Sequence, residues 1–265
     1  MRIEYACFGS GRTTSHSEVR MAGRLAAIHI RMLPTRTRVK GGVGRNEHAS
    51  RENAVIAGTE GYAQSASALF VRDEAIPFTE KHHAIFHLLP TEPSVVIDIG
   101  SGTGADASWL ASQGHEVVAV EPTDELRLRS MALHTARPIE WINDSLPYLA
   151  VVGCRRNRFR LVMLTAVWMH LDQKERESAM PNVASLLASN GTLIMSLRHG
   201  PVPDGRRMFE VSAEETILLA RSCGLREILN LCSQSVQYAN RSAGVTWTHL
   251  AFVSAPNKLP HATSR

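Results

Sequence analysis

The sequence predicts an α/β fold in which helices cover both faces of a mostly parallel sheet. The 95–99 segment, Val-Val-Ile-Asp-Ile, is mostly β-branched, which is typical of a strand buried on both faces. Strand-like and helix-like segments then alternate with short links, as in parallel sheets with crossover helices. The segments 226–232 and 245–254 follow each other without a helix between them, so they are expected to pair antiparallel at one edge.

The core 94–254 alternates strands and helices in a regular order. The expected strands before the final pair are 94–99, 116–120, 139–143, 160–165 and 192–197. The expected helices of the core are 105–113, 125–136, 173–188 and 213–222. Two further helices, 60–70 and 78–89, are expected in the segment 51–93 that precedes the core.

Capping residues support two of the expected helices. Asp172 precedes the helix 173–188, and the Asn-Gly pair at 190–191 is a stop signal beyond its end, while Pro181 is expected to kink it. Ser212 precedes the helix 213–222, and Glu215 lies three residues later, the spacing of a capping box.

The first fifty residues differ in composition from the rest. Residues 1–51 hold ten Lys or Arg and three Glu, a net charge of 10 − 3 = +7, so the remaining chain carries 4 − 7 = −3. Segment 1–50 could be an organelle transit peptide, a basic arm for nucleic acid or anionic lipid, or an over-extended translation start. We expect it, and the tail 255–265, to be disordered. Because the globular part is mildly acidic, the high pI argues only weakly for nucleic-acid binding.

The strand at 95–99 leads directly into alternating glycines, Gly100, Gly102 and Gly104, and then into a helix. This order places free backbone N–H groups beside a helix N-terminus, where a ligand can approach closely. Glu121 follows the second strand, at a position suited to binding the two hydroxyls of a ribose. Together these features predict a site for an adenosine-containing cofactor.

The segment 98–104, Asp-Ile-Gly-Ser-Gly-Thr-Gly, resembles the first motif of the class I S-adenosylmethionine (SAM)-dependent methyltransferases. The resemblance covers about residues 60–254 and includes Glu121, the Asp-Ser pair at 144–145 and the segment 164–171. It implies a Rossmann-like methyltransferase fold with a seven-stranded, mostly parallel sheet and an antiparallel edge strand. It also implies SAM as the cofactor, and a lid formed by the helices of 51–93.

The resemblance assigns roles to individual residues. Asp98 would face the amino group of SAM, Glu121 its ribose, and Asp144 with Ser145 its adenine, while Thr165 and Ala166 would lie beneath the sulfonium. The expected cofactor-binding residues are Asp98, Gly100, Ser101, Gly102, Gly104, Glu121, Pro122, Asp144, Ser145, Thr165 and Ala166. Other roles remain open at three of these positions: Asp98 could cap its turn, Glu121 could be an exposed strand-end acid, and Asp144 could cap a helix.

A dinucleotide dehydrogenase is the main rival. Gly100, Gly102 and Ala105 also satisfy the looser G-x-G-x-x-A fingerprint, and Glu121 suits the ribose of NAD equally well. The acid Asp98 ahead of the turn, the closing strand pair and the absence of a second α/β half favour the methyltransferase.

His170, Arg198 and His199 are the candidate catalytic residues, because they follow the fourth and fifth strands at the cleft. His170 could act as a base for a nucleophile of high pKa, or only shape the pocket. Arg198 and His199, with the arginines at 206–207, could orient an anionic substrate or form a solvated loop.

Lid and surface roles are expected for four other side chains. Tyr62 and Phe78 are expected to belong to the lid or to ordinary core packing, and the His pair at 82–83 is expected at the surface.

A small molecule is the expected methyl acceptor. The Asn-Pro-Pro-Tyr type of motif that marks many amino-group nucleic-acid methyltransferases is absent after the fourth strand. A nucleic-acid or protein methyltransferase that uses the basic arm, and a SAM-binding module without turnover, remain as alternatives.

The four cysteines form no C-x-x-C pair and no zinc-type cluster, so reduced thiols, no metal and a cytoplasmic location are expected. No apolar run reaches about 18 residues, so no membrane partner is expected.

Overall fold

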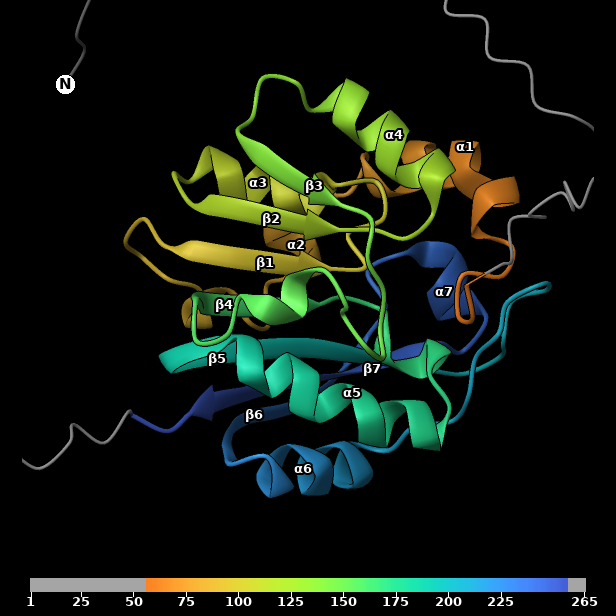
Figure 1. The fold of residues 1–265 in the computed structure, drawn as a ribbon. Helices are drawn as coiled ribbons and strands as arrows, with labels where there is room; N and C mark the ends of the chain where they lie inside the picture. The colour runs from red at the N-terminus through yellow and green to blue at the C-terminus, as the bar shows by residue number, and fades with distance from the viewer. Residues whose placement is uncertain (1–55, 257–265) are drawn as a thin grey trace, which may run out of the picture. The chain divides into compact units, whose positions relative to one another are not determined.

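The computed structural model describes residues 56–256, so segment 1–50 and positions 257–265 of the tail lie outside the described residues. Seven strands form one sheet in the order β3-β2-β1-β4-β5-β7-β6. They are β1 (Val95–Ile99), β2 (Glu116–Val120), β3 (Ile139–Ile142), β4 (Phe159–Leu164), β5 (Leu187–His199), β6 (Leu225–Gln234) and β7 (Thr246–Ser254). Figure 1 shows this order from β3 to β6.

The helices are α1 (Tyr62–Asp73), α2 (Phe78–Lys81), α3 (Ala105–Ser112), α4 (Asp124–Leu133), α5 (Gln173–Leu186), α6 (Ala213–Ser222) and α7 (Tyr238–Ser242). Three single-turn 3₁₀ helices lie at Phe86–Leu88, Val152–Cys154 and Trp168–His170. No helix within residues 56–256 is both long and apolar enough to cross a bilayer.

The predicted sheet is confirmed. β1 pairs in parallel with β2 and β4, β2 with β3, and β4 with β5. β7 runs antiparallel to both β5 and β6. The antiparallel strand is therefore β7, one position inside the edge strand β6.

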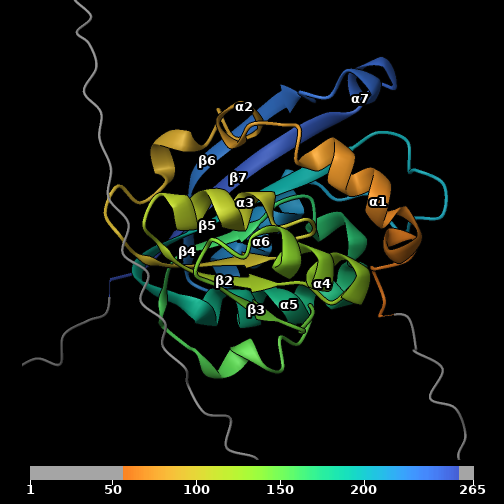
Figure 2. The ribbon, with the colours of Figure 1, turned by 90° about the horizontal axis from the view of Figure 1, so that it is seen from above.

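Apolar residues on the two faces of the sheet form two separate core layers. On one face, β-strand residues such as Val118 and Val162 pack in one cluster with α5 and α6 residues such as Met180 and Ile217. On the other face, Val96 packs in a second cluster with α3 and with the segment that follows α2. Figures 1 and 2 show α5 on one side of the sheet and α2 and α3 on the other. Asp98 alternates with Ile97 and Ile99, so it shares the face of Val96.

Helix caps follow the sequence pattern with one correction. Asp172 and Glu175 form a complete capping box at α5, with the Asp172 carboxylate accepting from Glu175 N at 2.9 Å. Ser212 Oγ accepts from Glu215 N at α6, as expected. The carboxylate of Glu215, however, binds the guanidinium of Arg176 at 2.8 Å instead of closing a capping box.

The largest differences from the expected elements lie in three places. The predicted helix 78–89 is short: α2 ends at Lys81, and a separate 3₁₀ turn covers 86–88. β5 begins at 187, directly after α5, so the Asn-Gly pair at 190–191 lies inside the strand and does not end the helix. The loop between β6 and β7 contains the short helix α7, which the sequence pattern did not indicate.

Candidate active site

The carboxyl ends of the parallel strands open onto two adjoining cavities. The larger has a volume of about 290 Å³ and lies among the glycine loop, helices α1 and α2, and the ends of β4 to β7. The smaller, about 100 Å³, lies beside the ends of β2 and β3. Tyr62, Gly100, Gly102 and Ala166 line both cavities, so a single elongated ligand can extend from one into the other.

The glycine loop has a conformation that side chains would disturb. Gly100, Gly102 and Gly104 all have positive φ, at 73°, 56° and 80°. The N–H groups of Gly100 and Ser101 both donate to Val120 O, which ties the loop to β2. A Cβ on Gly102 would meet no protein atom within 4 Å, so it would project into open space at the cavities.

Glu121 bridges the glycine loop and the start of α4. Its carboxylate is buried and accepts from Gly102 N at 2.9 Å and from Thr123 N at 2.8 Å. Burial raises the pKa of Glu121, although these hydrogen bonds oppose the rise. Glu121 and Pro122 line the smaller cavity, so the expected ribose site is adjacent to the glycine loop.

Asp98 lines the larger cavity, and one of its carboxylate oxygens is buried without a partner among the described residues. The side chain is buried, and its Oδ2 has no hydrogen-bond partner among the described residues. Burial, together with the nearby carboxylate of Asp106, raises the pKa of Asp98 to about 8. The hydroxyl of Ser101 is likewise buried without a partner in the described part of the chain. These two polar groups lack the partners that buried groups normally have, which indicates a ligand position.

A charged cluster lies next to Asp98. Asp106, in the first turn of α3, accepts from Lys81 Nζ at 3.0 Å and contacts His82 Nε2 at 2.9 Å. Burial alone would raise the pKa of Asp106, but His82 and Lys81 hold it well below its usual range. The surface prediction is therefore wrong for His82, which is buried by its pairing with Asp106, and correct for His83, which is exposed.

Asp144 and Ser145 line the smaller cavity, as expected for an adenine site. The carboxylate of Asp144 accepts from the backbone N–H groups of Ser145, Val151 and Val152 at 2.8 to 2.9 Å. It therefore organises the loop after β3, and its oxygens retain limited capacity for a further donor.

Thr165 and Ala166 lie at the end of β4 where the cavities meet. Thr165 lines the larger cavity and Ala166 lines both. Ala166 has φ of 59°, and its N–H donates to Ser196 Oγ at 2.9 Å. The conformation of this turn is thus fixed by β5.

His170 lies behind Tyr62, with both ring nitrogens in use. Nδ1 contacts Arg207 O at 2.7 Å, and a carbonyl can only accept, so Nδ1 carries the proton. In the neutral ring Nε2 then accepts from the Tyr62 hydroxyl at 2.8 Å. Burial lowers the pKa of His170 and keeps it neutral. His170 lines the smaller cavity, whereas Tyr62 lines both.

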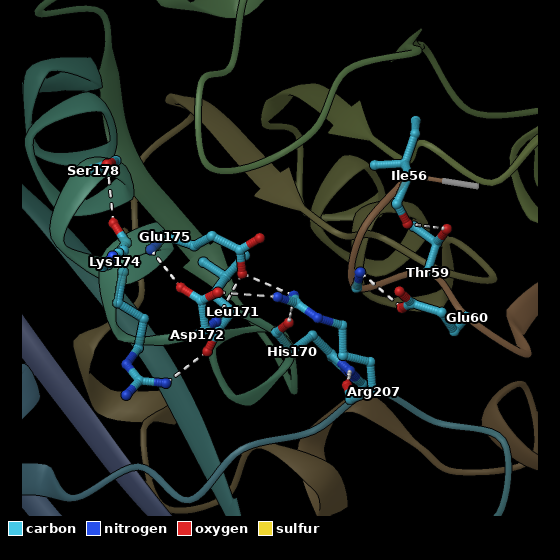
Figure 3. A network of polar contacts seen from close by, with 12 residues as sticks. Ile56, Thr59, Glu60, His170, Leu171, Asp172, Lys174, Glu175, Ser178 and Arg207 are labelled. Atoms are coloured by element: carbon cyan, nitrogen blue, oxygen red, sulfur yellow. Dashed lines mark hydrogen bonds and ion pairs between the residues drawn. The ribbon is translucent and has the colours of Figure 1, made fainter. Parts of the chain in front are cut away.

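Ion pairs hold Arg207 outside the larger cavity. Its guanidinium donates to Glu175 at 2.8 Å and to Asp172 at 3.2 Å, and also to His170 O at 2.7 Å (Figure 3). Arg207 therefore joins the loop after β5 to the capping box of α5, and its charge is already neutralised.

Arg198 and Arg206, by contrast, line the larger cavity and have no carboxylate partner among residues 56–256. Arg198 donates to Pro201 O at 2.7 Å. Arg206 donates to Glu60 O at 3.2 Å, and its guanidinium stacks 3.6 Å from the centre of the Tyr62 ring. Burial lowers the pKa of both arginines, as expected for charges removed from water without a counter-ion.

His199 faces away from both cavities. Its Nε2 contacts Thr248 Oγ1 at 2.8 Å, whereas Arg198 before it lines the larger cavity. Adjacent strand residues point to opposite faces, so Arg198 and His199 do not act together.

The sequence patterns did not identify several polar residues of β5 to β7 that line the larger cavity, among them Ser196, Ser233 and His249. The alternation of side chains along paired strands is the signal that could have indicated them, because all three share the face of Arg198.

Comparisons with known proteins agree with this geometry. Residues 96–191 match the model of a family described as a methyltransferase domain. No curated protein matches the sequence.

Several solved structures share the fold. The Burkholderia thailandensis 1,6-didemethyltoxoflavin-N1-methyltransferase has a TM-score of 0.58 at 19% identity, covering 73% of this chain and 85% of its own. A TehB-like SAM-dependent methyltransferase from Corynebacterium glutamicum has a TM-score of 0.54 at 19% identity, with 73% and 96% covered. The Haemonchus contortus phosphoethanolamine N-methyltransferase 2 has a TM-score of 0.57 at 15% identity, with 73% and 57% covered.

Proposed function

We propose that this chain is a class I SAM-dependent methyltransferase and that it transfers the methyl group of SAM to an anionic small molecule bound in the larger cavity; the match of residues 96–191 to a methyltransferase-domain family supports this. The observation that carries the proposal is that one cavity is lined both by the positive-φ glycine loop and by two arginines without a carboxylate partner among the described residues. The glycine loop and Asp98 serve the cofactor, and Arg198 with Arg206 serve the acceptor.

The residues present fit SAM. The unpaired Oδ2 of Asp98 suits the ammonium group of the ligand. Lys81 lines the same cavity and, beside its pairing with Asp106, has further N–H capacity for the ligand's carboxylate. The open space at Gly102 accommodates the methionine chain. Glu121 would hold the ribose hydroxyls, and the loop at 144–145 would contact the adenine.

Bound SAM supplies a methyl group on a good leaving group, so the protein contributes mainly by positioning. Thr165 and Ala166 lie where the two cavities meet, which is where the reacting carbon would be placed. The acceptor must then approach from the larger cavity, in line with the bond that breaks. Tyr62 and Arg206 cover this region from the lid and the loop after β5, and so exclude water.

Arg198 and Arg206 give the cavity its preference for anions. Each guanidinium has five N–H donors, and the hydrogen bonds described above use one on each. A carboxylate or phosphate between them would supply the missing counter-ion through charge-assisted hydrogen bonds. The volume of about 290 Å³ suits a small acceptor rather than a protein or nucleic-acid chain.

His170 acts by positioning Tyr62. Since Nδ1 holds a backbone carbonyl and Nε2 holds the tyrosine hydroxyl, a nucleophile has no free nitrogen to reach while the lid is in this position. Tyr62 lines both cavities, whereas His170 lines only the smaller one, so Tyr62 is the member of the pair at the proposed acceptor site. The named acceptors of the Burkholderia and Haemonchus enzymes are also small molecules, which supports this class of acceptor.

A direct test is methyl transfer from labelled SAM to a panel of small acceptors matched in pairs, each an acid and its neutral amide. We expect turnover with acids, and loss of at least tenfold in kcat/KM for the amides. The Arg198→Gln variant should lose the preference for acids, while Arg226→Gln, on the edge strand β6, should retain it. Equal turnover of acids and amides by the wild-type protein would refute the anionic acceptor.

A further inference from the structure

The floor of the larger cavity contains several polar side chains that the proposed cofactor site does not use. Ser196 of β5 pairs in register with His249 of β7, and Ser233 of β6 pairs with Trp247. Residues opposite each other in antiparallel strands share a face, so all four side chains lie on the face of Arg198. They line the cavity beyond the end of β4, on the side away from the ribose site.

His249 is fixed in place and neutral. It is buried, and its Nε2 contacts Ser233 Oγ at 2.9 Å. Burial, together with the nearby His82 and His83, lowers the pKa of His249 to about 4. A neutral imidazole offers one donor and one acceptor, and Ser233 engages only one of the two nitrogens. No hydrogen bond to Nδ1 is found within residues 56–256, so His249 has a remaining polar atom for a bound molecule.

Arg198 lies diagonally across the β5–β7 pair from His249. Arg198 pairs with Trp247, and His249 pairs with Ser196, two positions along the same strands. The α-carbons of such diagonal neighbours lie about 7–8 Å apart. Both side chains line the larger cavity, so its floor has a cationic group and a neutral hydrogen-bonding group that one small molecule can contact together.

We propose that His249, held by Ser233, is a specificity-determining residue that hydrogen-bonds a neutral hydroxyl, amine or ring nitrogen of the acceptor while Arg198 binds its anionic group. This inference rests on the proposed function, because it assigns the acceptor half of the same cavity. The acceptor class is a small carboxylate or phosphate compound that also has a neutral hydrogen-bonding group. His249 is too weakly basic to remove a proton, so its role is recognition.

The test uses the full chain saturated with S-adenosylhomocysteine and two pairs of probes. Benzoate and 4-hydroxybenzoate differ only in the neutral hydroxyl, and phenyl phosphate and 4-hydroxyphenyl phosphate repeat the comparison on phosphate. Dissociation constants are measured by ligand-observed NMR. We expect the hydroxylated member of at least one pair to bind about tenfold more tightly, the effect of one hydrogen bond in a buried site. The pair with the larger effect shows whether the anionic group of the acceptor is a carboxylate or a phosphate.

Three variants separate recognition from folding. His249→Phe keeps the ring and removes both nitrogens, so the hydroxylated and plain probes should then bind equally. His249→Asn retains a polar atom close to the position of Nδ1 and should recover part of the difference. His87→Phe makes the same change at an exposed residue outside both cavities and should leave the difference intact.

Two results would overturn the inference. One is an unchanged preference for the hydroxylated probes in His249→Phe; the other is no binding of any probe while S-adenosylhomocysteine binds normally. Failure of S-adenosylhomocysteine itself to bind the wild-type protein would instead refute the proposed function. The two failures are therefore distinguishable in one set of titrations.

Discussion

Asp98 is expected to release a proton when the ammonium group of the cofactor binds beside it. With a pKa of about 8 in the unliganded protein, the ratio of protonated to ionised Asp98 at pH 6.5 is roughly 30 to 1. A cation within about 4–6 Å lowers a carboxyl pKa by up to 3 units. A fall of two to three units, to about 5–6, leaves the group mostly ionised, so binding releases about 0.7 to 0.9 of a proton.

Calorimetry measures this release directly. The binding enthalpy of S-adenosylhomocysteine at pH 6.5, determined in buffers of different ionisation enthalpy, gives the number of protons released as the slope. S-adenosylhomocysteine has the same ammonium group as SAM without the sulfonium charge, so it isolates the contribution of Asp98. Asp98→Asn should bring the slope close to zero and weaken binding, whereas Asp204→Asn, an exposed carboxylate in the loop after β5, should preserve the slope.

A zero slope in the wild-type protein, with tight binding retained, would refute the reasoning. Asp98 would then be ionised before the ligand arrives, and the unpaired oxygen would not mark the ammonium position. A normal slope in Asp98→Asn would likewise assign the proton to another group.

Two further variants test the lid and the packing of the helices. Tyr62→Phe removes the hydrogen bond to His170 and should weaken SAM binding about two- to tenfold in calorimetry, as for one lost hydrogen bond; unchanged affinity would show that this contact does not hold the lid. Glu215→Gln leaves the buried guanidinium of Arg176 without its counter-ion and should lower the free energy of unfolding in urea by about 2 kcal/mol. The exposed neighbour Glu214, changed to Gln, should cost under about 0.5 kcal/mol, and equal losses in the two variants would contradict the ion-pair account.

The sheet could be predicted because the buried strands are mostly apolar runs. β2 extends over 116–120 as expected, and β1 and β4 differ from the prediction by one residue at their ends. The helix expected over 78–89 was wrong beyond Lys81, because the apolar residues of this segment fit a helical pattern although the chain turns after Lys81. The turn allows His82 to reach Asp106, a contact between segments 24 residues apart that no local pattern contains.

The residues of the proposed cofactor site could be located from the sequence because they follow strands at fixed spacings. Asp98, Gly102 and Glu121 all lie where the motif indicated, within a single strand-helix-strand unit. The proposed acceptor site depends on which face each residue of β5 and β7 presents. Arg198 and His199 are adjacent in sequence, and only the pairing of the strands decides that Arg198 faces the cavity and His199 does not.

The most direct test of the central claim is calorimetric titration of the protein with SAM and, separately, with NAD. The wild-type protein should bind SAM in the micromolar range and show no binding of NAD. Gly102→Val places a side chain in the open space at the glycine loop and should weaken SAM binding at least tenfold, or about 1.4 kcal/mol. Gly224→Val imposes the same kind of positive-φ strain, also in open space, beyond the end of α6, and should bind SAM normally. Binding of NAD without binding of SAM would contradict the assignment of the glycine loop to a methyl donor.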